Sequence, residues 1–119
     1  MSTMVVLGAS PTPERYSYKA VERLVRHRYH VVAVGKQKGF IGDLPIMTGK
    51  PAVTNVHSVL IYIAPFHQGE IVDYVISLRP KRVIFNPGTE NPEFEELLES
   101  YNIKVVHDCS LVMLALGRF

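Results

Sequence analysis

Cysteine is nearly absent from this sequence of 119 residues, in which Cys109 is the only one. A single thiol cannot form an intrachain disulfide, which excludes a disulfide-stabilised secreted fold and favours a reducing compartment. Long hydrophobic runs are also lacking, since none approaches the roughly 20 residues of a membrane-spanning helix. The first residues contain no basic stretch of the kind that opens a signal peptide. We therefore expect a cytoplasmic protein with no membrane partner.

The sequence has little excess charge of either sign. The net charge is +2, and the thirteen basic residues are spread along the chain rather than clustered as in proteins that bind nucleic acids. One modest basic group, at positions 23, 26, 27, 28 and 30, is interpreted as the solvated end of a helix, where positive charge is favourable. We expect no nucleic-acid partner.

The remaining composition is that of an ordinary globular protein. Hydrophobic residues make up 47% of the chain and charged residues 20%, which is enough apolar material for a core covered on two faces. A second independent core would need a longer chain. We therefore expect one domain over residues 1–119.

Short, β-branched apolar runs alternate with segments of helical spacing. Odd and even positions of these runs are both apolar, as in parallel strands that are buried on both faces. They cover residues 4–7, 30–34, 59–64, 82–85 and 103–106. Helical apolar spacing marks three helices between them, and a fourth is expected over residues 110–116, before Gly117. This alternation predicts a Rossmann-like three-layer α/β/α fold with a parallel sheet of about five strands.

Two further segments complete the predicted fold. The third helix has a clear start, with Asn91 as the N-cap and Pro92 at the first helical position. Residues 35–58 are rich in glycine and proline, and we interpret them as a loop with at most a short helical turn. In such folds ligands bind beyond the carboxyl ends of the strands, at the point where the strand order reverses.

The loop after the first predicted strand is the first candidate binding site. Its small residues Gly8, Ala9 and Ser10 would let a ligand approach the backbone closely. Ser17 is expected to cap a helix whose N-terminus favours phosphate, and Arg15 adds a planar donor fork for phosphate oxygens. The loop lacks the G-x-G-x-x-G spacing of the standard dinucleotide fingerprint. It predicts a phosphate site of another kind.

The end of the second predicted strand is the second candidate site. Proteins that bind NAD place an acidic residue there to hold the ribose diol, but here Gly35 is followed by Lys36, and no acid occurs before Asp43. A lysine at this place suits a ribose that carries its own phosphate. Coenzyme A, with a 3′-phosphate, and NADP, with a 2′-phosphate, both meet this condition.

Five segments, most of them at the ends of predicted strands, form a recognisable set. They are Gly8-Ala9-Ser10 with Pro13-Glu14-Arg15 and Ser17-Tyr18, then Val34-Gly35-Lys36, Ile63-Ala64-Pro65-Phe66, Asn86-Pro87-Gly88-Thr89-Glu90-Asn91, and Ile103-Lys104-Val105-Val106-His107-Asp108-Cys109. The set resembles the CoA-binding domain family of small stand-alone proteins, which is similar to the N-terminal domain of the succinyl-CoA synthetase α subunit. The resemblance spans nearly the whole chain, and the first loop and the Asn-Pro-Gly segment are its most specific parts.

This resemblance implies a role for each matched position toward coenzyme A or an acyl-CoA. Residues of the first loop would hold the pyrophosphate, and Lys36 would hold the ribose phosphate. The turn after the third strand would line the path of the adenine or the pantetheine, and the Asn-Pro-Gly segment would bound the outer end of the cleft. The cofactor-binding residues expected are Gly8, Ala9, Ser10, Arg15, Ser17, Gly35, Lys36, Ala64, Pro65, Phe66, Asn86, Pro87 and Gly88.

The sequence contains no evident catalytic or metal-binding constellation. The five histidines and the single cysteine lack the spacing of a zinc site. Cys109 and His107 straddle a strand end, and Cys109 stands one position away from the family's usual cysteine. We therefore expect no catalytic residue and no metal, and Cys109 is given no role.

Two other functions stay open, an NADP-binding reductase-like protein and a ligand-free interaction domain. An acyl-CoA enzyme or a second copy of the chain are the protein partners left open.

Overall fold

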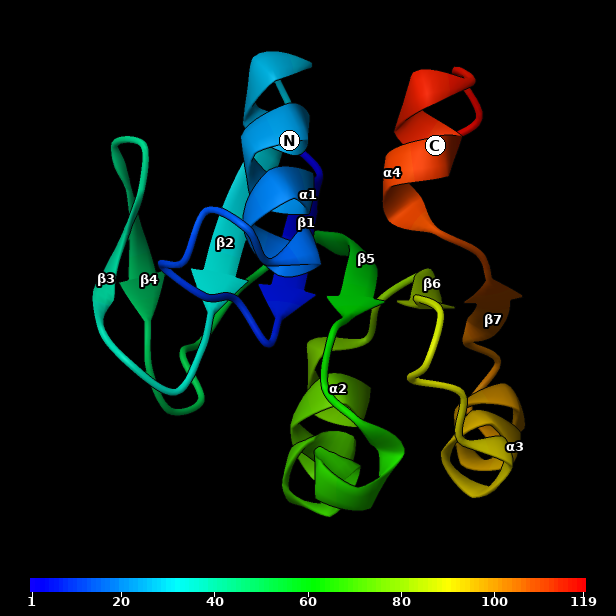
Figure 1. The fold of residues 1–119 in the computed structure, drawn as a ribbon. Coiled ribbons are helices and arrows are strands. Elements are labelled where there is room, and N and C mark those ends of the chain that lie inside the picture. Colours follow the sequence, from blue (N-terminus) through cyan, green and yellow to red (C-terminus); the bar gives the residue numbers. More distant parts are fainter.

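A computed structural model describes all residues from 1 to 119 (Figure 1). It contains seven strands, four α-helices and one 3-10 helix, labelled η1. In chain order these are β1 (Thr3–Leu7), α1 (Tyr16–Arg26), β2 (His30–Val34), β3 (Gly39–Ile41), β4 (Leu44–Met47), β5 (Val56–Ile61), η1 (Pro65–Ile71), α2 (Val72–Leu78), β6 (Arg82–Phe85), α3 (Pro92–Ser100), β7 (Lys104–His107) and α4 (Ser110–Ala115). None of the helices combines the length and apolar character that crossing a membrane requires.

The strands form one sheet in the order β3-β4-β2-β1-β5-β6-β7. All neighbouring strands pair in parallel except β3 and β4, which are antiparallel. The chain starts at β1, builds the sheet outward on one side through β2 and the β3–β4 hairpin, and then returns to build the other side from β5. The strand order therefore reverses between β1 and β5, next to the middle of the sheet.

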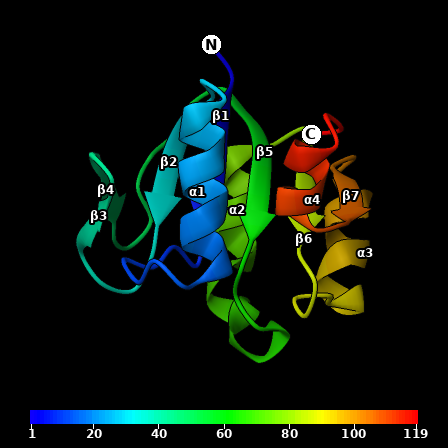
Figure 2. The same ribbon diagram turned by 45° about the horizontal axis from the view of Figure 1, so that its top comes forward.

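Two helices cover each face of the sheet, as Figures 1 and 2 show for α1 and α4 on one face and α2 and α3 on the other. Successive residues of β1 point to opposite faces, as strand geometry requires. Val6 belongs to the apolar core that includes Leu24 of α1 and Leu114 of α4. Val5 belongs to the core under the other helices, which includes Val75 of α2. The predicted three-layer, Rossmann-like α/β class is confirmed.

The link between β2 and β5 differs from the prediction. Residues 39–47 form the β3–β4 hairpin, which brings the sheet to seven strands, so the interpretation of this segment as a loop was wrong. The hairpin has a two-residue turn at Gly42 and Asp43, and its side chains alternate between buried, as in Ile41 and Ile46, and exposed, as in Phe40. Both features are typical of a hairpin, but the density of glycine and proline concealed them.

The predicted boundaries of the other elements hold more closely. Strands β2 and β6 match residue for residue, and α3 begins at Pro92 with the Asn91 side chain accepting a hydrogen bond from the Phe94 amide, as expected of an N-cap. The third predicted strand is displaced, because β5 covers Val56–Ile61 rather than residues 59–64. The turn that follows β5 therefore begins at Tyr62.

Two glycines allow the ends of three strands to meet backbone to backbone. Gly8, after β1, has a φ of 91°, and a Cβ there would lie 2.6 Å from the Tyr62 carbonyl oxygen, which follows β5. At Gly35, after β2, a Cβ would lie 2.1 Å from the Ala9 carbonyl oxygen. Real Cβ atoms do not approach oxygen so closely, and both oxygens belong to the main chain, which cannot turn away as a side chain does. Only glycine fits at either position.

We predict that Gly35→Ala will lower the free energy of unfolding by about 2 kcal/mol, because the added methyl group forces main-chain segments apart. Gly69→Ala is the matched control, since a Cβ there meets nothing within 4 Å. Urea denaturation of the two variants and the parent protein measures the difference. Equal stability of all three would contradict the close backbone contact.

Candidate functional site

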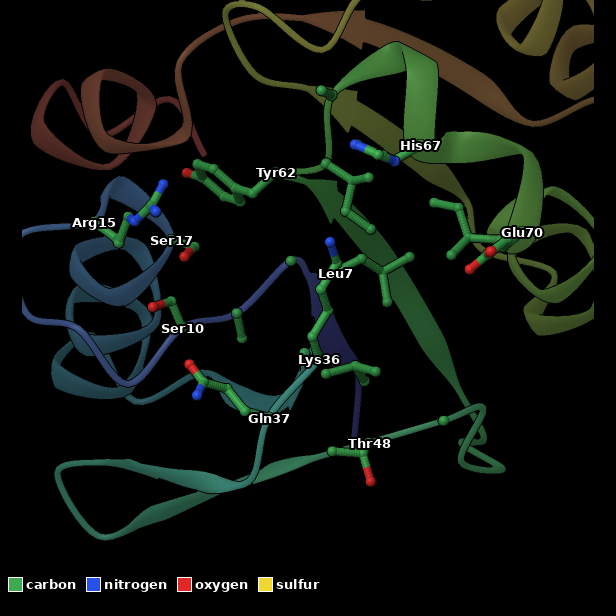
Figure 3. Close-up of a pocket in the computed structure, with 18 of the residues that line it drawn as sticks. Leu7, Ser10, Arg15, Ser17, Lys36, Gln37, Thr48, Tyr62, His67 and Glu70 are labelled. Carbon is green, nitrogen blue, oxygen red and sulfur yellow. The ribbon is translucent and has the colours of Figure 1, made fainter.

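A cavity of about 910 Å³ opens beyond the carboxyl ends of the central strands (Figure 3). Its volume lies in the range of roughly 300–1,000 Å³ that is usual for sites of small molecules and cofactors. Most of the residues that line it follow β1, β2, β4 and β5, and residues from the start of α1, from η1 and from α2 complete the wall. The cavity thus lies where the strand order reverses, which is the place that ligands occupy in sheets of this kind.

The structure brings eight of the predicted residues together around this cavity. The N-terminal loop and helix supply five of them, and the segments after β2 and β5 supply the others. They are Gly8, Ala9, Ser10, Arg15, Ser17, Gly35, Lys36 and Ala64. Positions far apart in the sequence therefore share one site, because parallel strands present their carboxyl ends at the same edge of the sheet.

Backbone amides on the floor of the cavity already donate hydrogen bonds to main-chain carbonyls. The amides of Gly8 and Ala9 both donate to the Val34 carbonyl, at 3.0 and 2.9 Å. The Gly35 amide donates to the Met47 carbonyl at 2.9 Å. Gly8, Ala9 and Gly35 therefore shape the floor, while their amides are committed to joining β1, β2 and β4. Hydrogen bonds to an anion must come from other groups around the cavity.

The N-terminus of α1 supplies such groups. The helix has 11 residues and begins at Tyr16, no side chain caps it, and the Lys19 amide donates to the Arg15 carbonyl. The first three helical amides have no intrahelical acceptor, and together with the helix dipole they favour an anion. The prediction that Ser17 caps this helix was wrong. Arg15 has the extended backbone of an N-cap, and Ser17 is the second helical residue, with its side chain beside the cavity.

Three cationic side chains line the cavity, and none of them has a partner. Arg15, Lys36 and Lys50 face only one carboxylate, that of Glu70. The two ion pairs of the protein lie elsewhere and involve none of these groups. In Figure 3 the Lys36 side chain extends from the end of β2 into the cavity, with Arg15 on one side and Glu70 on the other. The cavity is therefore positively charged and suited to a ligand with several negative charges.

Two of the tyrosines that line the cavity pack on opposite faces of the sheet, Tyr62 on the side of α1 and α4 and Tyr74 on α2. The Tyr62 hydroxyl is buried without a hydrogen-bond partner, and this burial raises the pKa of its phenol. The nearby Ser110 hydroxyl offsets part of that rise, although the two groups do not form a hydrogen bond of normal geometry. The Tyr74 hydroxyl donates to the Pro51 carbonyl at 2.6 Å, and burial raises its pKa as well. Both phenols are thus neutral groups beside the cations.

Five of the predicted residues lie outside the cavity lining, namely Pro65, Phe66, Asn86, Pro87 and Gly88. Phe66 is 87% exposed and stacks edge to face against the ring of His67, which does line the cavity. Pro65 begins η1. The turn after β5 is displaced because β5 ends three residues earlier than predicted, so that only Ala64 of the expected three reaches the cavity.

The Asn-Pro-Gly segment connects elements of the fold. The Asn86 side chain is buried, donates to the Ile61 carbonyl at 3.2 Å and accepts a hydrogen bond from the Ser110 amide at 2.8 Å. It thereby ties β6 to β5 and to the start of α4. Next to it, the fully buried Gln68 donates to the Ile63 and Thr89 carbonyls at 2.8 and 2.7 Å. These bonds hold η1 against the loop after β6.

Several lining residues were missed by the sequence reasoning. Some follow β4, others follow β5 or lie on η1 and α2, and the rest adjoin residues already predicted. They are Leu7, Tyr16, Val34, Gln37, Thr48, Gly49, Lys50, Tyr62, Ile63, His67, Glu70, Ile71 and Tyr74. Recognition of the hairpin turn at positions 42 and 43 would have placed Thr48, Gly49 and Lys50 at a strand end. His67 follows closely on the end of a predicted strand, which places it near the cleft, but no comparable signal in the sequence marks Glu70.

The strand order, the layers and the position of the cavity define a Rossmann-like α/β protein. Comparison with protein families identifies the particular group: residues 2–115 match the model described as a CoA binding domain. The chain belongs to this CoA-binding domain family, and membership supports coenzyme A binding in general.

Solved structures share the fold of this chain. An uncharacterized protein is 44% identical and superimposes with a TM-score of 0.96. The match covers 100% of this chain and 98% of that one. A protein from Thermus thermophilus is 24% identical with a TM-score of 0.81, covering 99% of this chain and 90% of that one. A hypothetical protein from Pyrococcus horikoshii OT3 is 22% identical with a TM-score of 0.82, covering 96% and 81%. The last two show the fold alone. The curated proteins gave no match.

Proposed function

We propose that the protein binds coenzyme A or an acyl-CoA in the cavity beyond β1, β2 and β5. The observation that carries the proposal is the set of three unpartnered cations, Arg15, Lys36 and Lys50, around one cavity that also contains the uncapped start of α1. Coenzyme A carries a pyrophosphate and a separate ribose phosphate, so its negative charges are distributed over two places. Membership in the CoA-binding domain family supports the same ligand.

In this proposal the pyrophosphate binds at the start of α1. The free amides of the first helical turn donate to its oxygens, and the Arg15 guanidinium adds a charge-assisted, planar pair of donors. The hydroxyls of Ser10 and Ser17 lie on the same side of the cavity. Gly8, Ala9 and Gly35 contribute a flat floor rather than hydrogen bonds, because their amides already bond to main-chain carbonyls.

Lys36 binds the ribose phosphate in the same proposal. It follows directly on Gly35 at the end of β2, where a protein that binds NAD would carry an acid. Ala64 lies beside the path of the pantetheine or the adenine. The thiol of coenzyme A, or the acyl group that it carries as a thioester, extends beyond these phosphate contacts.

A panel of ligands tests the proposal by thermal unfolding. Coenzyme A at 100 times its dissociation constant should add about 2.7 kcal/mol of stability, which raises the melting temperature of a protein of this size by roughly 10 °C. We expect smaller shifts with 3′-dephospho-coenzyme A and none with NAD at equal concentration. A shift with NADP alone would identify NADP, and not coenzyme A, as the ligand. No shift with any ligand would favour a ligand-free interaction domain.

Lys36→Ala should weaken coenzyme A by about tenfold or more, the usual worth of a charge-assisted hydrogen bond. Binding of 3′-dephospho-coenzyme A should change little, because that ligand lacks the phosphate assigned to Lys36. Lys38→Ala is the matched control, since Lys38 is exposed and lies outside the cavity lining. Isothermal titration calorimetry measures the affinity for both ligands. Equal losses of affinity for the two would exclude Lys36 from the ribose-phosphate site.

Arg15→Ala should weaken coenzyme A and 3′-dephospho-coenzyme A to the same extent, by about tenfold or more, because both ligands contain the pyrophosphate. Arg26→Ala makes the same change of charge at the exposed far end of α1 and serves as the control. Calorimetry at one fixed salt concentration measures the affinities. Unchanged affinity in the Arg15 variant would exclude Arg15 from the pyrophosphate site.

A further inference from the structure

The segment that follows β4, residues 48–50, is held at two fixed points on the cavity wall. At its start, the Met47 carbonyl accepts a hydrogen bond of 2.9 Å from the Gly35 amide. At its end, the Pro51 carbonyl accepts one of 2.6 Å from the Tyr74 hydroxyl of α2. The segment therefore runs from the end of β2 toward α2, and Lys50 occupies a defined place along it.

This course brings Lys50 next to the end of β2, where Lys36 also lies. Strands β2 and β4 are parallel neighbours, with Val34 paired to Met47. Parallel neighbours are separated by about 4.8 Å, and Lys36 and Lys50 follow that last pair by two and three residues. Both lysines line the same cavity. Two lysines thus follow adjacent strand ends and line one cavity.

Nothing in the protein balances the charge of Lys50. Its side chain forms no ion pair and no hydrogen bond to a protein group. The one carboxylate of the cavity, Glu70, lies on η1. Two like charges on adjacent strand ends repel each other unless an anion lies between them.

We infer that Lys50 is a second determinant of ligand specificity, which binds the ribose phosphate together with Lys36. The inference rests on the proposed function and extends it, because it assigns the ribose-phosphate subsite to two strand ends instead of one. A phosphate monoester carries close to two negative charges at neutral pH, so a pair of lysines matches it better than one. A ligand that has only a pyrophosphate leaves this pair without a partner.

The test compares Lys50→Ala and Lys50→Arg with the parent protein, using coenzyme A and 3′-dephospho-coenzyme A in calorimetric titrations. Lys50→Ala should weaken coenzyme A roughly five- to tenfold and leave 3′-dephospho-coenzyme A within about twofold, since only the ribose phosphate is lost from the contact. Lys50→Arg should retain most of the affinity. Lys38→Ala, which removes an equal charge from the same side of the sheet outside the lining, should have little effect.

The outcomes separate this inference from the function on which it rests. Binding of coenzyme A by the parent protein with an unchanged affinity in Lys50→Ala would overturn the role of Lys50 and leave the proposed function intact. Equal losses for the two ligands would assign Lys50 to the pyrophosphate and so overturn the ribose-phosphate subsite. No binding of coenzyme A by the parent protein would overturn the proposed function itself. Circular dichroism confirms that each variant is folded, as expected for an exposed position.

Discussion

The contact of main-chain segments at Gly8 and Gly35 is the constraint on which the site depends. The loop after β1 lies between the loop after β2 and the loop after β5, and it touches each through a carbonyl oxygen that occupies the space of a missing Cβ. This contact closes the middle of the sheet at its carboxyl edge. It also limits where α1 can begin, because only seven residues lie between Gly8 and Tyr16. The cavity wall is therefore defined by backbone before any side chain is considered.

Because of the same contact, the backbone amides around the cavity fall into two groups. The amides on the floor are consumed in joining the three central strands, whereas the amides at the start of α1 keep their hydrogen-bonding capacity. Positive charge then comes from side chains that reach over the floor from three directions: Arg15 from the helix, Lys36 from β2 and Lys50 from the segment after β4. The result is a neutral, rigid floor beneath a charged rim, which suits an extended ligand with phosphates at separate places.

Much of this arrangement could be predicted from residues alone, and the exceptions have physical causes. Alternating buried runs indicated the parallel strands, because a strand covered on both faces must be apolar on both parities. The candidate residues in the first loop and after β2 were found because strand ends share one edge. The hairpin was missed, since its short strands contain the glycine and proline that usually interrupt structure. Glu70 lies on a 3-10 helix whose course depends on buried Gln68, a tertiary contact that no local pattern reveals.

The turn of the β3–β4 hairpin and its base differ in how well they can tolerate insertions. Its turn at Gly42 and Asp43 is exposed, meets no neighbouring segment within 4 Å of Gly42, and lies at the opposite edge of the sheet from the cavity. Insertions at that tip would lengthen both strands without disturbing Ile41 or Ile46 in the core. The base of the hairpin, where the Met47 carbonyl bonds to the Gly35 amide, tolerates no such change, nor does the segment after it, where the Pro51 carbonyl bonds to the Tyr74 hydroxyl. Over evolutionary time the hairpin can vary in length while Lys50, in the segment after it, keeps its position at the cavity.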